Sequence, residues 1–247
     1  MKALILAAGR GSRLGPRTAD RPKGLVELGG KSLIARAITS LTDGGCSAIA
    51  LVTGYRAETL AGLTETRFHN PRWAETNMVA SLMTAEPWLQ SEKVIVSYSD
   101  IFYTPETVRA LAAAPGEIVV SFDPEWQTLW EERSSDPLSD AESFKRDDSG
   151  TLIDIGRRVT SFTEIEGQYM GLVKFSPAGW KKALAAIASL PAHEQDRLDM
   201  TSLLARLIAK DVAIATVAKI GPWGECDNES DLAVYERWLA QGVLTLP

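Results

Sequence analysis

Residues 6–23 read LAAGRGSRLGPRTADRPK and begin at the end of a short apolar run, ALIL at residues 3–6. An apolar run that gives way to small residues and glycines is typical of the first strand of an α/β sheet and of the loop that follows it. Nucleotides bind at that edge of such sheets. The stretch therefore predicts an α/β fold with a nucleotide site over its first strand.

This loop is rich in glycine and in positive charge. Gly9 and Gly11 let backbone N–H groups approach a phosphate, because no Cβ stands in the way. Pro16 and Pro22 are expected to prevent a continuous helix. A loop this basic in a chain of net charge −6 predicts a polyanionic ligand. The five cations are Arg10, Arg13, Arg17, Arg21 and Lys23.

Two common phosphate-binding patterns do not fit the loop. The dinucleotide pattern G-x-G-x-x-G, started at Gly9, would need a third glycine where Leu14 stands. A P-loop ending at residues 30–32 would need a glycine where Leu25 stands. The sequence therefore predicts neither an NAD-binding fold nor a P-loop kinase.

The composition is that of an acidic globular chain. With 247 residues, of which 45% are hydrophobic, we expect one domain over residues 1–247, with an acceptor-side insertion at residues 123–166. A net charge of −6 argues against nucleic acids and membrane surfaces as partners, since both need an extended basic face. No apolar stretch approaches the ~20 residues of a membrane span, and we expect a cytoplasmic protein. Cys46 and Cys226 are expected to be reduced core thiols.

Apolar runs alternate along the chain as they do in α/β proteins. Strands are expected at residues 49–52, 94–98, 118–122, 169–175 and 212–217. Helices are expected at residues 33–41, 105–113 and 177–190, with others starting near Met78 and Asp199 and a last one ending near Leu239. Within the insertion, residues 151–153 and 159–162 are expected to form short antiparallel strands.

Three carboxylates are candidate metal ligands. Asp100 follows the strand expected at residues 94–98, which is where a Mg²⁺ ligand beside a polyphosphate belongs. The alternative is an aspartate that only caps a turn. In an extended segment, alternation would place Glu225 and Asp227 on one side, so that both can face one cation.

Two asparagines have the position of helix N-caps. Asn77 either only caps the helix that follows or, together with the Ser81 hydroxyl, also donates to a base or phosphate. Asn228 is expected to cap the last helix, within a solvated acidic turn that includes Glu229 and Asp231.

The opening stretch resembles the signature of nucleotidyltransferases that activate sugar phosphates and small phospho-alcohols, LAAGxGxR followed by a Pro-Lys pair. The matching residues are 6–13 and Pro22-Lys23. The chain as a whole resembles the LicC-type cytidylyltransferases, which include phosphocholine cytidylyltransferases and relatives that act on 2-aminoethylphosphonate. This narrower resemblance rests on residues 6–23, 76–82, 100, 167–172 and 223–227.

The resemblance implies a GT-A-like mixed α/β sheet and a Mg²⁺-dependent transfer of CMP from CTP to a small phosphate or phosphonate acceptor, with release of pyrophosphate. It implies that Arg13 holds the triphosphate and that Lys23 bridges the α-phosphate and the acceptor. Asp100 and Asp227 would hold Mg²⁺, with Glu225 as a further candidate. The nucleotide would contact Leu6, Ala7, Ala8, Gly9, Arg10, Gly11, Ser12, Thr53, Asn77, Ser81 and Ser99.

An acceptor that carries an ammonium group would need aromatic faces and a carboxylate around it. The rings available in the insertion and the returning strand are Trp126, Trp130 and Tyr169. The alternative is that these rings only pack the insertion onto the sheet.

Other functions remain open on the sequence. One is a sugar-1-phosphate nucleotidyltransferase, which would share the opening loop, and another is a nucleotide-sensing module without chemistry. A GT-A glycosyltransferase is disfavoured, because residues 99–102, SDIF, contain one aspartate where such enzymes usually have Asp-x-Asp. We expect a monomer or a homodimer.

Overall fold

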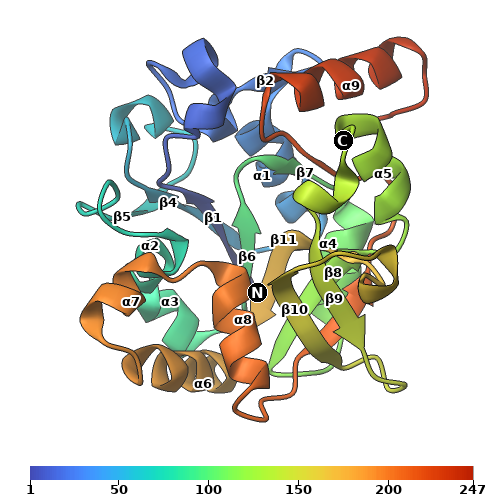
Figure 1. Cartoon of the computed structure of the whole chain (residues 1–247). Helices are drawn as coiled ribbons and strands as arrows, with labels where there is room; N and C mark the ends of the chain where they lie inside the picture. The colour runs from blue at the N-terminus through green and yellow to red at the C-terminus, as the bar shows by residue number, and fades with distance from the viewer. Residues whose placement is uncertain (247) are drawn as a thin grey trace.

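The computed structural model describes residues 1–246, which surround a central seven-stranded sheet of order β12-β8-β11-β6-β1-β4-β5 (Figure 1). β1 (Lys2–Ala7) lies in the middle, parallel to both β4 (Ala48–Thr53) and β6 (Val94–Tyr98). β5 (Thr66–His69) extends the sheet beyond β4, also in parallel. The loop after β1 therefore opens at the edge where four parallel strands end.

The other half of the sheet is mixed. β11 (Gln168–Phe175) runs antiparallel between β6 and β8 (Ile118–Asp123). β12 (Ala215–Ala218) pairs in parallel with β8 and forms the far edge. The predicted mixed α/β sheet is thus confirmed, although β12 starts later than predicted because Val212 is still hydrogen-bonded to Leu207 at the end of the preceding helix.

Helices cover both faces of the sheet, and β1 shows why two cores form (Figure 1). Ala3, Ile5 and Ala7 face one core, whereas Leu4 and Leu6 face the other, as the two-residue period of a strand requires. Helices α1 (Leu33–Asp43), α4 (Pro105–Ala113), α5 (Trp126–Arg133) and α9 (Glu229–Ala240) contribute to the first core. Helices α2 (Met78–Met83), α3 (Glu86–Ser91), α6 (Pro177–Ala188) and α8 (Met200–Ile208) contribute to the second, next to the short α7 (Ala192–Arg197).

The segment 123–166 differs from the prediction in detail. Its hairpin consists of β9 (Glu142–Arg146) and β10 (Leu152–Arg158), and residues 159–161 are not a strand. The sequence of β9 is mostly polar. The strand is held by its pairing with β10 and by the ring of Phe144, which stacks on the ring of Phe122 with centroids 5.1 Å apart. Helix α5 was not predicted, although its apolar residues at positions 126, 129 and 130 have helical spacing.

Two small ribbons complete the fold. β2 (Glu27–Leu28) pairs with β3 (Lys31–Ser32), and β7 (Ile101–Phe102) pairs antiparallel with β13 (Gly224–Glu225). The second ribbon joins segments that lie far apart in the sequence and places residue 100 beside residue 227.

Two further predictions concern the thiols and membrane spans. Cys46 and Cys226 are buried free thiols, as predicted. Among residues 1–246, every helix is too short or too polar to span a lipid bilayer.

Candidate active site

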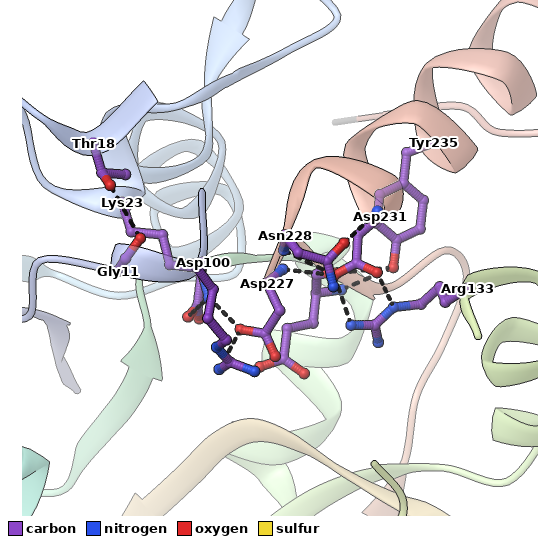
Figure 2. Close-up of polar contacts among 11 residues, drawn as sticks. Gly11, Thr18, Lys23, Asp100, Arg133, Asp227, Asn228, Asp231 and Tyr235 are labelled. Carbon is purple, nitrogen blue, oxygen red and sulfur yellow. Dashed lines mark hydrogen bonds and ion pairs between the residues drawn. The ribbon is translucent and has the colours of Figure 1, made fainter. Parts of the chain in front are cut away.

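The loop after β1 is folded against Lys23. Gly11 has a φ of 73°, and a Cβ built there would lie 2.5 Å from the Cβ of Lys23. The Thr18 hydroxyl donates to the carbonyl oxygen of Gly11 at 3.1 Å and so closes the loop (Figure 2). Residues 12–18 form a 3₁₀ segment that is broken at Gly15, so the loop is not one continuous helix, as predicted. Because Gly11 has no side chain, the side chain of Lys23 can pack directly against the loop.

Lys23 lies between two aspartates (Figure 2). Its Nζ donates to Oδ2 of Asp100 at 2.6 Å and also to Oδ1 of Asp227. Arg13, which is largely exposed, donates to the same Asp227 oxygen at 2.9 Å. The four predicted charged residues are thus brought together from three segments: the first loop, the end of β6 and the segment before α9.

Lys23 and Asp227 each stabilise the charged form of the other. Burial alone would lower the pKa of Lys23, but Asp100, Asp227 and Glu225 outweigh it and raise that pKa. Burial alone would raise the pKa of Asp227, but Lys23 and Arg13 outweigh it and lower that pKa. Lys23 and Asp227 are therefore both charged at neutral pH.

The third carboxylate of the cluster behaves differently. Burial, followed by the charges of Asp227 and Asp100, raises the pKa of Glu225 to about 8. The like charges of these three groups favour either a proton or a cation between them.

These carboxylates fit a divalent cation. Asp100, Glu225 and Asp227 each offer an oxygen, and these oxygens lie within 4.8 Å of one another. In the described chain, Oδ1 of Asp100 is buried without a hydrogen-bond partner, and this free oxygen fits the role of a cation ligand. A set of oxygen donors only suits a hard cation such as Mg²⁺.

Helix α9 fixes the segment that carries two of these carboxylates. The hydroxyl of Tyr235 accepts from the backbone N–H of Glu225 and donates to its carbonyl oxygen, each at 3.1 Å. Asn228 caps α9 as predicted, accepting from the N–H of Asp231 at 3.0 Å. The prediction that Asp231 lies in a solvated turn is wrong, since the residue is 1% exposed and pairs with Arg133.

Two adjoining cavities form one cleft around this cluster. One, of about 230 Å³, opens over the glycine loop, and the other, of about 300 Å³, opens over β11 and the insertion. They share Arg13, Met78 and Tyr98. Lys23 and Asp100 line the first, while Glu225 and Asp227 line the second, so the charged cluster stands at their junction. We refer to them as the loop half and the β11 half of the cleft.

Most of the residues predicted to bind nucleotide line the loop half. These are Leu6, Ala8, Gly9, Gly11, Asn77, Ser81 and Ser99. Four others do not line it: Ala7 packs into the core, the Thr53 hydroxyl donates to the carbonyl oxygen of Phe68, Arg10 lies over the ring of Tyr55, and Ser12 is exposed.

Asn77 is the N-cap of α2, as predicted. Its Oδ1 accepts from the N–H of Met78 at 2.7 Å, and its Nδ2 donates to the carbonyl oxygen of Arg197 at 3.1 Å. Ser81 lies one turn later, where its hydroxyl accepts from Nδ2 of Asn70 at 2.9 Å. Both side chains line the loop half, and each is also engaged within the protein.

Two of the three predicted acceptor aromatics line the β11 half. Trp130 and Tyr169 do, and the indole nitrogen of Trp130 is buried without a hydrogen-bond partner among residues 1–246. Trp126 does not line it but packs against Trp130 and Phe162, with ring centroids 6.0 and 5.9 Å away. Trp126 therefore packs within the segment 123–166, as the alternative to an acceptor contact predicted.

Several lining residues were missed in the sequence. Tyr98 had a signal, because it ends the predicted strand just before Ser99-Asp100. The ring of Tyr98 also explains why residue 171 is a glycine, because a Cβ at that position would lie 2.8 Å from the ring. Thr76, in the loop half, and Gln168, in the β11 half, lie in stretches that carried the resemblance but were not named as site residues. Four others were not singled out as site residues by any motif: Trp73 in the loop half, and Asp140, Glu142 and Asp199 in the β11 half.

The β11 half carries uncompensated negative charge away from the cluster. Asp140, Glu142 and Asp199 line it, and within the described part of the chain none of them forms an ion pair. Burial, and next the charge of Asp199, raise the pKa of Glu142. The only basic side chain among the lining residues is Arg13, which is already paired with Asp227.

A glycine-rich basic loop, a shared lysine and two joined cavities on such a sheet are the arrangement of a nucleotidyltransferase, an enzyme that joins a nucleotide to an acceptor. The family of the MobA-like NTP transferase domain matches residues 3–210, and the chain belongs to this family.

A relative of similar length agrees with this assignment, and two solved structures have a similar fold. The chain is 36% identical to the CTP:phosphoglutamine cytidylyltransferase of Campylobacter jejuni, over 95% of this chain and 98% of that protein. Its fold is similar to that of the inositol-1-phosphate CTP transferase from T. maritima, with a TM-score of 0.74, 21% identity and coverage of 99% and 98% of the two chains. The CTP:phosphocholine cytidylyltransferase from Streptococcus pneumoniae has a TM-score of 0.70, 20% identity and coverage of 96% and 98%.

Proposed function

We propose that the enzyme transfers CMP from CTP to a small acceptor that carries both a phosphate or phosphonate and an ammonium group, and that it releases pyrophosphate. The observation that carries the proposal is the charged cluster of Lys23, Asp100 and Asp227 at the junction of the two halves of the cleft. The choice of CTP is supported by the relative that is 36% identical over nearly the whole chain.

In this reaction, an acceptor oxygen attacks the α-phosphorus of CTP. The new bond joins that oxygen to phosphorus, and the bond between the α-phosphorus and the bridging oxygen breaks, with its electron pair leaving on pyrophosphate. Phosphate esters have a second pKa of about 6, so the attacking oxygen is already anionic near neutral pH. The reaction therefore needs no dedicated general base.

Catalysis by this chain then consists of positioning and charge neutralisation. Lys23 would lie between the α-phosphate and the acceptor anion and reduce their repulsion. Arg13, which lines both halves, would hold the triphosphate and steady the leaving pyrophosphate. Asp100 and Asp227, with Glu225, would hold Mg²⁺, which supplies charge neutralisation at the phosphates when bound.

The acceptor is proposed to bind in the β11 half with its ammonium group near Glu142 and Asp199. These carboxylates have no cationic partner in the described chain, and an ammonium would supply one. Trp130 and Tyr169 would add aromatic surface beside it. Phosphoglutamine, the acceptor in the relative's name, has an amino-acid ammonium group and is the first candidate. Phosphocholine and 2-aminoethylphosphonate fit the same description.

Pyrophosphate release in the presence of Mg²⁺ tests the proposal. CTP, UTP, ATP and GTP are each combined with phosphoglutamine, phosphocholine, 2-aminoethylphosphonate and glucose 1-phosphate. We expect turnover with CTP and one of the three acceptors that carry an ammonium group. Turnover only with glucose 1-phosphate would overturn the proposal in favour of a sugar-activating enzyme, and nucleotide binding without turnover would favour a sensing module.

A further inference from the structure

A buried ion pair between Arg133 and Asp231 adjoins Asp227, one of the candidate metal ligands. Arg133, at the end of α5, donates through Nε to Oδ1 and through Nη2 to Oδ2 of Asp231, both at 3.0 Å (Figure 2). The two side chains are 4% and 1% exposed. Neither residue lines the cleft in the part of the chain that the structure describes.

Stability alone explains this pair poorly. Removing two charges from water is costly, and well-packed apolar side chains often stabilise a core as well as a buried ion pair does. In addition, Nη1 of Arg133 is buried without a hydrogen-bond partner among residues 1–246. An arginine held at this cost points to a role in placing other groups.

The carboxylate that Arg133 holds also fixes the backbone of Asp227. Oδ2 of Asp231 accepts from the N–H of Asp227 at 2.8 Å and from the N–H of Asn228 at 3.2 Å. The side chain of Asp227 leaves this anchored backbone to meet Lys23 (Figure 2). The hydrogen bond from the Asp227 backbone to Asp231 thus helps to fix the position of the Asp227 carboxylate.

Arg133 contacts the wall of the β11 half as well. Its guanidinium lies 4.9 Å from the ring centroid of Trp130, which lines that half. Trp130 in turn stacks on Trp223, with centroids 6.0 Å apart and planes inclined by 20°. Trp223 lies directly before β13, whose Glu225 belongs to the cluster. One arginine therefore contacts both the support of Asp227 and the acceptor wall.

We propose that Arg133 and Asp231 are positioning residues for the reaction: they hold Asp227 where it can ligate a divalent cation, and Arg133 joins this support to the acceptor wall. The inference rests on the proposed function, because it concerns the same site. Groups that orient a metal ligand typically change metal affinity or activity about 10- to 100-fold when they are replaced.

The test measures metal binding without turnover. Mn²⁺ alone is titrated calorimetrically into the wild-type protein and into Arg133→Met and Asp231→Asn, with melting temperatures and circular dichroism recorded to show folding. The matched control is Arg237→Met, which breaks the exposed ion pair of Arg237 with Glu132, at 2.5 Å, between the same helices α9 and α5. We expect the Kd for Mn²⁺ to rise about 10- to 100-fold in the two test variants and to be unchanged in the control.

Other outcomes separate this inference from the proposed function. A Kd for Mn²⁺ within twofold of wild type in a folded Arg133→Met or Asp231→Asn would show a merely structural pair and overturn the inference. If Arg133→Met does not fold, Asp231→Asn and Arg133→Lys carry the same test. A wild-type protein that does not bind Mn²⁺ would also overturn it, whereas pyrophosphate release by the wild type tests the proposed function independently.

Discussion

The Nζ of Lys23 lies 2.6 Å from Oδ2 of Asp100 and also contacts Asp227, so two carboxylates from distant segments share one buried cation. This relationship places the lysine where the two halves of the cleft meet. Arg13 contacts Asp227 from the solvent side and completes the charged group.

Replacing the shared cation is expected to disable the enzyme. Lys23→Ala removes the charge that lets two anions approach, and we expect kcat to fall by at least about 10²-fold, the scale of one lost preorganised electrostatic contact. The measurement is steady-state pyrophosphate release with the best acceptor of the assay. Lys31→Ala is the control, because the Lys31 ammonium donates to the Thr39 hydroxyl on α1 and, among residues 1–246, does not line either half of the cleft. Near-normal turnover of Lys23→Ala would contradict the assigned role.

The close approach of Gly11 to Lys23 gives a second prediction. Gly11→Ala adds a Cβ 2.5 Å from Lys23 at a φ of 73°, whereas Gly30→Ala adds one at a φ of 74° with no atom within 4 Å. Both should cost about 1 kcal/mol of unfolding free energy from the left-handed backbone. Only Gly11→Ala should also lower kcat, because Lys23 must move. Equal kcat in the two variants would show that the approach does not matter for catalysis.

The carboxylate cluster predicts dependence on a divalent cation. Removal of metal with EDTA should abolish pyrophosphate release, and added Mg²⁺ should restore it. In Asp100→Asn, the oxygen that now lacks a partner becomes part of a neutral amide, so half-maximal activity should require about tenfold more Mg²⁺ or more. The exposed Asp148→Asn should have the wild-type Mg²⁺ dependence. Full activity in EDTA would refute the metal assignment.

The charge of the β11 half predicts how the acceptor is chosen. Glu142→Gln removes a carboxylate proposed to bind the ammonium group, and the acceptor KM should rise about tenfold or more, since hydrogen bonds to charged groups contribute about 1.5–3 kcal/mol. The KM for CTP should remain unchanged, and Asp148→Asn again provides the control. An equal rise in KM for an acceptor analogue that lacks the ammonium group would argue against recognition of that group.

The aromatic wall can be tested in the same assay. Tyr169→Phe removes a hydroxyl from a residue of the cavity wall, and Trp130→Ala removes a ring of that wall. Both should raise the acceptor KM, whereas Trp126→Phe, outside the cleft, should affect stability only. An unchanged acceptor KM in both Tyr169→Phe and Trp130→Ala would remove the aromatic contribution from the proposal.

Features that depend on short stretches of sequence could be predicted. The strand 2–7, the glycine loop and the helix caps at residues 77 and 228 depend on neighbours within a few positions. Helix 105–113 was predicted with its observed bounds, because its period and its initial proline are local signals. Lys23, Asp100 and Asp227 were predicted as site residues, but their mutual contacts were not.

The sequence by itself determined the class of fold and the chemistry of the loop after β1, since backbone freedom at glycines and the periodicity of apolar residues act over a few positions. Only the tertiary structure decided that the ribbon of residues 101–102 and 224–225 joins Asp100 to Asp227, and that Asp231 is buried against Arg133. It also decided that Glu142 and Asp199 line one cavity. The physical reason is that strand pairing, burial and ion pairing depend on partners far apart along the chain, and no local pattern specifies them.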